Sequence, residues 1–103
     1  MSVETKSDLL ELLHANRHRI KALGVERIGL FGSFSREEQT VESDVDLLVE
    51  FVSGQKSFDN FIHLAFFLED LLERKVELTT PESLSPYIGP RILASVEYAP
   101  INA

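Results

Sequence analysis

Two aspartates, Asp44 and Asp46, stand one residue apart at the start of a predicted strand. In an extended chain, residues i and i+2 face the same side, so both carboxylates project from one face. Like charges this close repel each other, and a divalent cation removes the conflict. Mg²⁺ binds carboxylate oxygens and keeps waters or substrate phosphates as its other ligands. The pair therefore predicts a metal site for phosphoryl or nucleotidyl transfer, and the alternative is a solvated turn before a strand.

A Gly-Ser pair precedes these acids at the end of another apolar segment. Gly32 and Ser33 follow a strand predicted at residues 27–31, and Arg36 lies three residues further on. Glycine lets the backbone approach a ligand closely, and exposed N–H groups beside a serine hydroxyl suit phosphate oxygens. Taken alone, the pair is equally compatible with an ordinary turn after a strand. The chain has neither a GxGxxG nor a Walker-type Gly-Lys-Ser sequence, which argues against those two modes of nucleotide binding.

Apolar periodicity predicts the elements that position these residues in the first half of the chain. Residues 6–23 have the pattern of an amphipathic helix, with Thr5 and Asp8 as a capping pair and Gly24 as a stop. Residues 45–51 have the pattern of a strand. One face of that strand carries Val45, Leu47, Val49 and Phe51, and the other carries Asp46, Leu48 and Glu50.

The second half predicts a helix, a strand and a last short helix. The helix runs from a cap at Ser57 or Asp59 to about residue 74, and its apolar face is either core or a surface that contacts a partner. A strand at 75–79 and a helix at about 90–98 follow. This order predicts an α/β (α+β) fold, a small mixed sheet flanked by helices.

Composition narrows the functional classes. The chain has 103 residues, seventeen acidic and ten basic, with a net charge of −7, which argues against a broad nucleic-acid-binding face and against direct nucleic-acid binding. The excess of acidic over basic residues is confined to residues 28–103, which hold thirteen acidic and five basic residues. With no cysteine, thiolate metal sites and cysteine nucleophiles are excluded. The polar start and the short apolar runs predict a cytoplasmic protein without membrane association.

The combined pattern of these residues resembles that of the DNA polymerase β-like nucleotidyltransferases. More closely, it is similar to the minimal nucleotidyltransferase (MNT) family, the antitoxins of HEPN–MNT toxin–antitoxin modules. The family pattern is Gly-Ser, then Ala-Arg-Gly, then Ser-Asp-x-Asp-Leu. The matching residues here are Gly32-Ser33, Arg36, Ser43-Asp44-Val45-Asp46-Leu47 and Val49.

This resemblance implies a site and a reaction. The family carries a third acid on the strand after the amphipathic helix, where this chain has Glu77. By resemblance, Asp44, Asp46 and Glu77 hold one or two Mg²⁺ ions, while Gly32, Ser33 and Arg36 bind the phosphates of ATP. The implied fold is the polymerase-β-like nucleotidyltransferase fold, with residues 1–103 as a single domain. The implied reaction transfers AMP from ATP to a tyrosine hydroxyl of a HEPN ribonuclease toxin and silences it.

Three positions depart from the family pattern. Ser35 replaces the usual alanine, Glu37 stands where glycine is favoured, and Glu77 replaces aspartate and is one methylene longer. These departures raise the alternative that the chain keeps the fold but is catalytically weak or inactive, and neutralises its partner by binding alone. Nucleotidyl transfer to a small molecule is a third, remoter alternative, because the chain has no room for the second domain that larger relatives use.

The remaining interpretations concern other residues and the assembly. His14 and His18 are spaced i, i+4, but neighbouring arginines favour a solvated basic helix face over a zinc site. Tyr87 and Tyr98 are compatible with packing or with modification. The predicted partner is a HEPN-domain toxin, and both a homo-oligomer and a hetero-oligomer with the toxin are compatible with the sequence.

Overall fold

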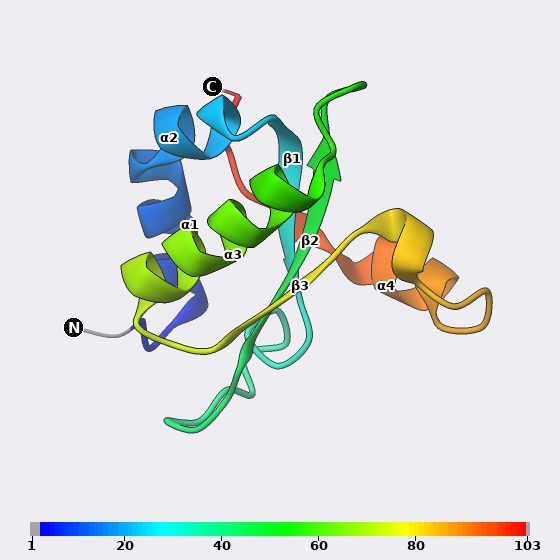
Figure 1. Ribbon diagram of the computed structural model, residues 1–103. Coiled ribbons are helices and arrows are strands. Elements are labelled where there is room, and N and C mark those ends of the chain that lie inside the picture. Colours follow the sequence, from blue (N-terminus) through cyan, green and yellow to red (C-terminus); the bar gives the residue numbers. More distant parts are fainter. Residues whose placement is uncertain (1–2, 103) are drawn as a thin grey trace.

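A four-stranded mixed sheet forms the centre of the protein, and the computed structural model describes residues 3–102 of it (Figure 1). In chain order the elements are α1 (Lys6–Ala15), α2 (Arg17–Ala22), β1 (Val25–Phe31), β2 (Val45–Phe51), α3 (Phe58–Leu72), β3 (Val76–Thr79), the 3-10 turn η1 (Pro81–Ser83), α4 (Gly89–Ser95) and β4 (Glu97–Tyr98). The expected α/β fold with a small mixed sheet is confirmed.

The strand order is β3-β2-β1-β4. β1 pairs antiparallel with both β2 and β4, whereas β2 and β3 are parallel and are joined through α3. A parallel pair needs a crossover connection, and the fifteen-residue α3 supplies it. The two central strands are therefore β1 and β2, which are connected by the loop of residues 32–44.

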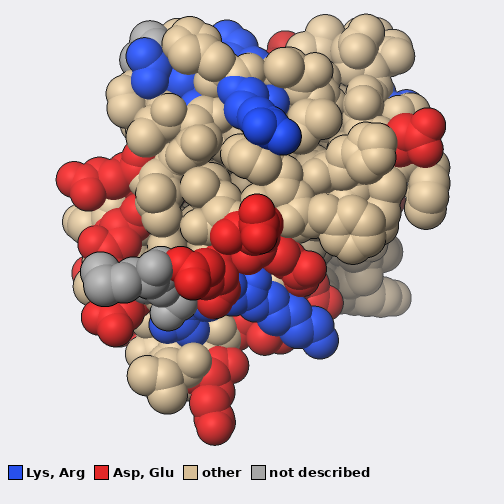
Figure 2. Space-filling model, turned by 60° about the vertical axis from the view of Figure 1, so that its left-hand side comes forward, with Lys and Arg blue, Asp and Glu red and all other residues tan. Residues whose placement is uncertain are grey.

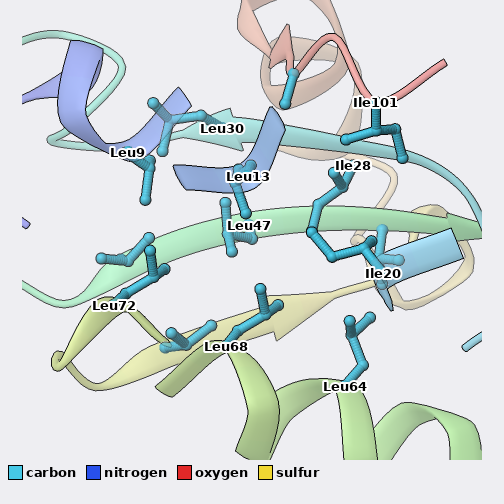
Figure 3. Close-up of a cluster of buried hydrophobic side chains, with 14 of the residues drawn as sticks. Leu9, Leu13, Ile20, Ile28, Leu30, Leu47, Leu64, Leu68, Leu72 and Ile101 are labelled. Atoms are coloured by element: carbon cyan, nitrogen blue, oxygen red, sulfur yellow. The ribbon is translucent and has the colours of Figure 1, made fainter. Parts of the chain in front are cut away.

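The hydrophobic core lies on one face of the sheet. Figure 1 shows α1, α2 and α3 on this face and α4 on the other side of the strands. Figure 3 shows side chains from the three helices meeting those of β1 and β2, together with Ile101 from the C-terminal segment. The alternation predicted for β2 is confirmed, because Val45, Leu47 and Val49 are fully buried in this core. The opposite face of β2 therefore presents Asp46 on the side away from the core.

Local hydrogen bonds explain where the helices begin. Thr5 and Asp8 form the predicted capping box at the start of α1, each side chain accepting from the other residue's backbone N–H. Ser57, one of the two predicted caps, accepts from the N–H of Asn60 at the start of α3. No helix in residues 3–102 is long and apolar enough to cross a membrane.

Two predicted elements differ in the structure. The single helix expected at 6–23 is two helices, because the chain breaks at Asn16, whose side-chain amide donates to the Leu12 carbonyl. Arg17 likewise donates to the His14 carbonyl, while the backbone N–H of Asn16 still donates to the Leu12 carbonyl at 3.1 Å, so the side-chain bonds add to the backbone bonding at the break. The last helix ends at Ser95 rather than near Tyr98, because residues 97–98 form the edge strand β4 beside β1.

Candidate nucleotidyl-transfer site

The loop of residues 32–44 begins with Gly32 and Ser33 and ends with Asp44, three of the residues predicted to form the site. Two backbone bonds close a tight turn at its start, from the Arg36 N–H to the Gly32 carbonyl (3.1 Å) and from the Glu38 N–H to the Ser33 carbonyl (2.8 Å). At the other end, the Ser43 hydroxyl accepts from the Thr40 N–H at 2.8 Å. The loop therefore has a defined shape at both ends, next to β1 and next to β2.

The parallel pairing of β2 and β3 places the second and third predicted acids side by side. Asp46 and Glu77 are direct partners in the register of this pair, and Phe31 is the partner of Asp46 on β1. Directly paired residues project from the same face, here the face away from the core. The two strands thus bring together carboxylates that lie thirty-one positions apart in the sequence.

The surroundings of Asp46 raise the pKa of its carboxyl. Burial raises the pKa of Asp46, and the negative charges of Glu77 and Asp44 raise it further, while the positive charge of Arg36 lowers it. Within residues 3–102, the side chains of the three acids form neither a hydrogen bond nor an ion pair. Asp44, Asp46 and Glu77 are therefore an electrostatically coupled group whose oxygens are free to accept a ligand.

Gly32 brings the backbone directly against this group. Its φ is +76°, and a Cβ placed on it would collide with Oδ2 of Asp46. Any other residue would therefore push the Asp46 carboxylate away, in addition to adopting an unfavourable backbone conformation. The sequence predicted that the backbone at the Gly-Ser pair would closely approach a ligand. In the structure, the backbone at Gly32 closely approaches the side chain of Asp46.

The donor set of this group fits Mg²⁺ in its chemistry. All three side chains offer hard carboxylate oxygens, which is the ligand type this ion prefers. In the described chain, no three acidic or histidine side chains converge closely enough to form a ready-made metal site. Mg²⁺ commonly binds through one or two carboxylates together with waters and substrate phosphates, so a partly assembled carboxylate set is compatible with it.

A pocket of about 360 Å³ opens next to Gly32. It lies between the end of β1 and helix α4, and its lining residues are Phe31, Gly32, Arg36, Ile88, Arg91, Ile92 and Ser95. The Nε of Arg36 contacts Oε1 of Glu38 at 2.7 Å, and both side chains are exposed. Two cationic side chains over apolar walls suit a nucleotide, whose phosphates are anionic and whose base is flat and largely apolar.

The contribution of α4 to this pocket was missed at the sequence level. Arg91 and Ser95 lie four residues apart on one helical face, so that both line the same pocket. A helix-period pattern shows which residues share a face, but not that the face is opposite Gly32. The sequence indicates Arg91 only as a single arginine after the Gly89-Pro90 start of a helix. This pattern is common on protein surfaces and does not indicate a pocket.

Outside the site, one histidine and one tyrosine make hydrogen-bonding contacts between distant parts of the chain. His14 and His18 lie on different helices, and Nδ1 of His14 contacts the Pro100 carbonyl at 2.6 Å. Tyr98 donates to Oε2 of Glu50 at 2.8 Å, whereas Tyr87 is exposed.

The apolar face of α3 was predicted to be either core or a surface that contacts a partner, and its aromatic residues are found in both kinds of position. Phe61 and Phe67 pack against the core, and Phe58 and Phe66 are exposed. The face is therefore core over most of its length, with two aromatic rings left at the surface.

Glu37 has an unusual backbone at the position where the family favours glycine. Its φ is +56°, in the left-handed region that glycine adopts without strain. Glu37→Gly is expected to stabilise the fold by up to about 1 kcal/mol, seen as a higher midpoint of urea denaturation. Glu42→Gly is the matched control, since Glu42 is an exposed acid of the same loop without a positive φ. Equal effects of the two substitutions would contradict the assignment of strain to Glu37.

Acidic side chains gather at the end of the molecule that holds this loop. Figure 2 shows them concentrated over the lower half of the view, the end at which Figure 1 places residues 32–44. Most of the charged side chains at the top of the same view are lysine and arginine. The face seen in this view is therefore negative at the end that holds the loop.

Comparison with known proteins gives the same class as the fold and the site. The family description "Nucleotidyltransferase domain" matches residues 10–99. The protein adenylyltransferase MntA of Thermococcus cleftensis is 36% identical over 99 residues, which cover 95% of this chain and 99% of that protein. A solved structure described as "putative minimal nucleotidyltransferase" superposes with a TM-score of 0.70 at 32% identity, covering 85% of this chain and 93% of that one.

A more distant solved structure shares the fold alone. It contains a tri-AMPylated HEPN toxin of Shewanella oneidensis in complex with an MNT antitoxin, and it matches with a TM-score of 0.54 at 22% identity. The match covers 82% of this chain and 69% of that one.

A mixed sheet that presents coupled acids beside a Gly-Ser turn defines the class as nucleotidyltransferase, in agreement with these matches. The chain belongs to the nucleotidyltransferase domain family, and within it to the minimal nucleotidyltransferases. The family expected from the sequence is therefore confirmed. The roles of the individual site residues stay predictions.

Proposed function

We propose that this chain is a Mg²⁺-dependent protein adenylyltransferase that transfers AMP from ATP to a tyrosine hydroxyl of a HEPN-domain ribonuclease toxin and thereby neutralises it. The observation that carries the proposal is the coupled group Asp44, Asp46 and Glu77 beside the pocket at Gly32. The name of the Thermococcus cleftensis relative supports the reaction, and the Shewanella oneidensis complex supports the kind of partner.

Each residue has a defined part in this reaction. Asp44 and Asp46 hold the metal ion, which supplies positive charge that offsets the charge of the phosphates. Backbone N–H groups at Gly32 and Ser33 bind the β- and γ-phosphates. Arg36, and Arg91 across the pocket, hold the triphosphate in place. These contacts contribute mainly by positioning and by electrostatic stabilisation.

The transfer itself forms one bond and breaks another. The tyrosine oxygen attacks the α-phosphorus of ATP, the bond between that phosphorus and the bridging oxygen to the β-phosphate breaks, and pyrophosphate leaves. The hydroxyl proton is released as the oxygen attacks. Glu77, exposed at the edge of the acidic group, orients the hydroxyl and accepts this proton.

Intact mass of the HEPN partner tests the proposal. After incubation with this chain, ATP and Mg²⁺, the partner is expected to gain mass in steps of one adenylyl group and to lose ribonuclease activity. The double variant Asp44→Asn with Asp46→Asn should add no mass while still forming the complex. Glu42→Gln, which removes an exposed charge from the same loop, is the matched control and should transfer normally.

The alternative of neutralisation by binding alone has a different outcome in the same experiment. If the partner loses its ribonuclease activity without gaining mass, and the double variant protects equally well, contact accounts for the neutralisation. The observation that favours this second candidate is that no ready-made three-acid metal site exists in the described chain.

A further inference from the structure

A single arginine outside the family motif ties together three separate parts of the chain. Arg74 lies in the short connection between α3 and β3, and its side chain is half-buried. Its Nε donates to the Val3 carbonyl at 2.5 Å. Its Nη1 lies 2.9 Å from the Thr40 carbonyl, 2.9 Å from the Ser43 carbonyl and 3.4 Å from the Val41 carbonyl. One guanidinium thus binds the N-terminal segment and the end of the loop 32–44.

The same guanidinium also contacts the start of that loop. Its central carbon lies 4.9 Å from the centre of the Phe34 ring, and Phe34 is fully buried directly after the Gly-Ser pair. Arginine stacks on aromatic faces, so this contact adds to the hydrogen bonds. Arg74 therefore contacts Phe34 near the start of the loop and Ser43 near its end. These two residues follow Ser33 and precede Asp44, respectively.

Backbone hydrogen bonds next to Arg74 connect the same segments. The Val45 N–H donates to the Lys75 carbonyl at 2.9 Å, and the Val3 N–H donates to the Leu72 carbonyl at 3.2 Å. In Figure 1, the described start of the chain lies beside the turn from α3 to β3. Asp44 is thus flanked by two peptides, at Ser43 and at Val45, that are both bound to the Arg74–Lys75 connection. Its own carboxylate has neither a hydrogen bond nor an ion pair in the described chain.

We propose that Arg74 is a positioning residue, which fixes the loop 32–44 and thereby holds the Asp44 carboxylate in place for the reaction. The inference rests on the proposed function of Asp44. The bonds at Val3 and at the loop come from different nitrogens of one planar group, and Phe34 stacks on that plane. Lysine has a compact ammonium on a flexible stem, so Arg74→Lys keeps the charge without this geometry.

The test compares Arg74→Ala and Arg74→Lys with the wild type in the full chain. Arg17→Ala is the matched control, because Arg17 also donates to a backbone carbonyl (His14, 2.9 Å) but lies at the α1–α2 junction. Three quantities are measured, namely amide hydrogen exchange of residues 40–45, Mn²⁺ affinity of the chain, and kcat and KM of adenylyl transfer.

Both Arg74 variants are expected to speed amide exchange in residues 40–45 and to weaken Mn²⁺ binding by about tenfold. Transfer is expected to lose on the order of tenfold to a hundredfold in kcat, with KM for ATP nearly unchanged. Arg17→Ala should change none of these. Full rescue by lysine would overturn the proposal, since charge alone would then be sufficient.

The readouts separate failure of this inference from failure of the proposed function. Faster exchange with normal Mn²⁺ affinity and normal kcat would show that loop order is not needed for the site, which overturns the inference. Unchanged exchange would overturn it at its first step. If the wild type itself transfers no AMP, the proposed function fails, and Mn²⁺ affinity still decides whether Arg74 positions the acidic group.

Discussion

Asp46→Asn is expected to abolish adenylyl transfer and, at the same time, to raise the thermal stability of the protein. The loss in transfer is expected to be about 10³-fold, because a carboxylate that holds the metal ion contributes several kcal/mol to the transition state. The gain in stability follows from the repulsion that Asp46 experiences from Glu77 and Asp44 and from its partial burial. Asparagine has a similar shape and removes the charge.

The raised pKa of Asp46 also determines how the stability of the protein changes with pH. Because the pKa of Asp46 is raised in the folded state, the native protein binds this proton more tightly than the unfolded chain does. The stabilising contribution is complete below the ordinary pKa of an aspartate and is lost as the pH rises through the raised value. At neutral pH the ionised carboxylate therefore costs stability, and Asp46→Asn should flatten the stability profile in the mildly acidic range.

Thermal denaturation with and without Mg²⁺ measures both parts of this prediction. Mg²⁺ should raise the Tm of the wild type, because a ligand that binds only the native state stabilises it, and it should have little effect on Asp46→Asn. Glu42→Gln is the control for loss of one negative charge in a protein with a net charge of −7. A variant that is both less stable and fully active would contradict the assignment of Asp46 to a charged metal site.

The hairpin that carries the site could be predicted from the sequence because its signals are local. The alternation along β2 placed Asp46 on the face away from the core, and that placement is confirmed. The pairing of Asp46 with Glu77 follows from a parallel crossover through α3, whereas the sequence predicted only a small mixed sheet without saying which strands pair. Glycine at position 32 was identified by its place after a strand, and its positive φ agrees with a close backbone approach.

The rest depends on contacts between residues that are distant in the sequence. Arg74 lies 71 positions from Val3 and 31 positions from Ser43, and no periodicity indicates which carbonyls its guanidinium meets. Arg91 lines the pocket only because α4 folds across the end of β1. At the break at Asn16, the side chains of Asn16 and Arg17 donate to backbone carbonyls, and a continuous amphipathic pattern does not show such bonds.

Gly32→Ala is expected to reduce transfer by about a hundredfold, because it displaces the Asp46 carboxylate from its place against the backbone. The substitution has two separate costs. One is the left-handed backbone at φ +76°, which costs an alanine about 1–2 kcal/mol of stability. The other is the collision of the new Cβ with Oδ2 of Asp46.

Gly54→Ala separates the two costs, because Gly54 has nearly the same φ (+83°) and a methyl group added there would meet no atom within 4 Å. Both variants should lose a similar amount of stability from the backbone conformation, measured by urea denaturation. Only Gly32→Ala should lose transfer and Mn²⁺ affinity, since only its methyl group moves a carboxylate of the acidic group. If Gly32→Ala keeps full transfer while losing as much stability as Gly54→Ala, Asp46 does not need its contact with Gly32. The glycine would then serve the turn alone.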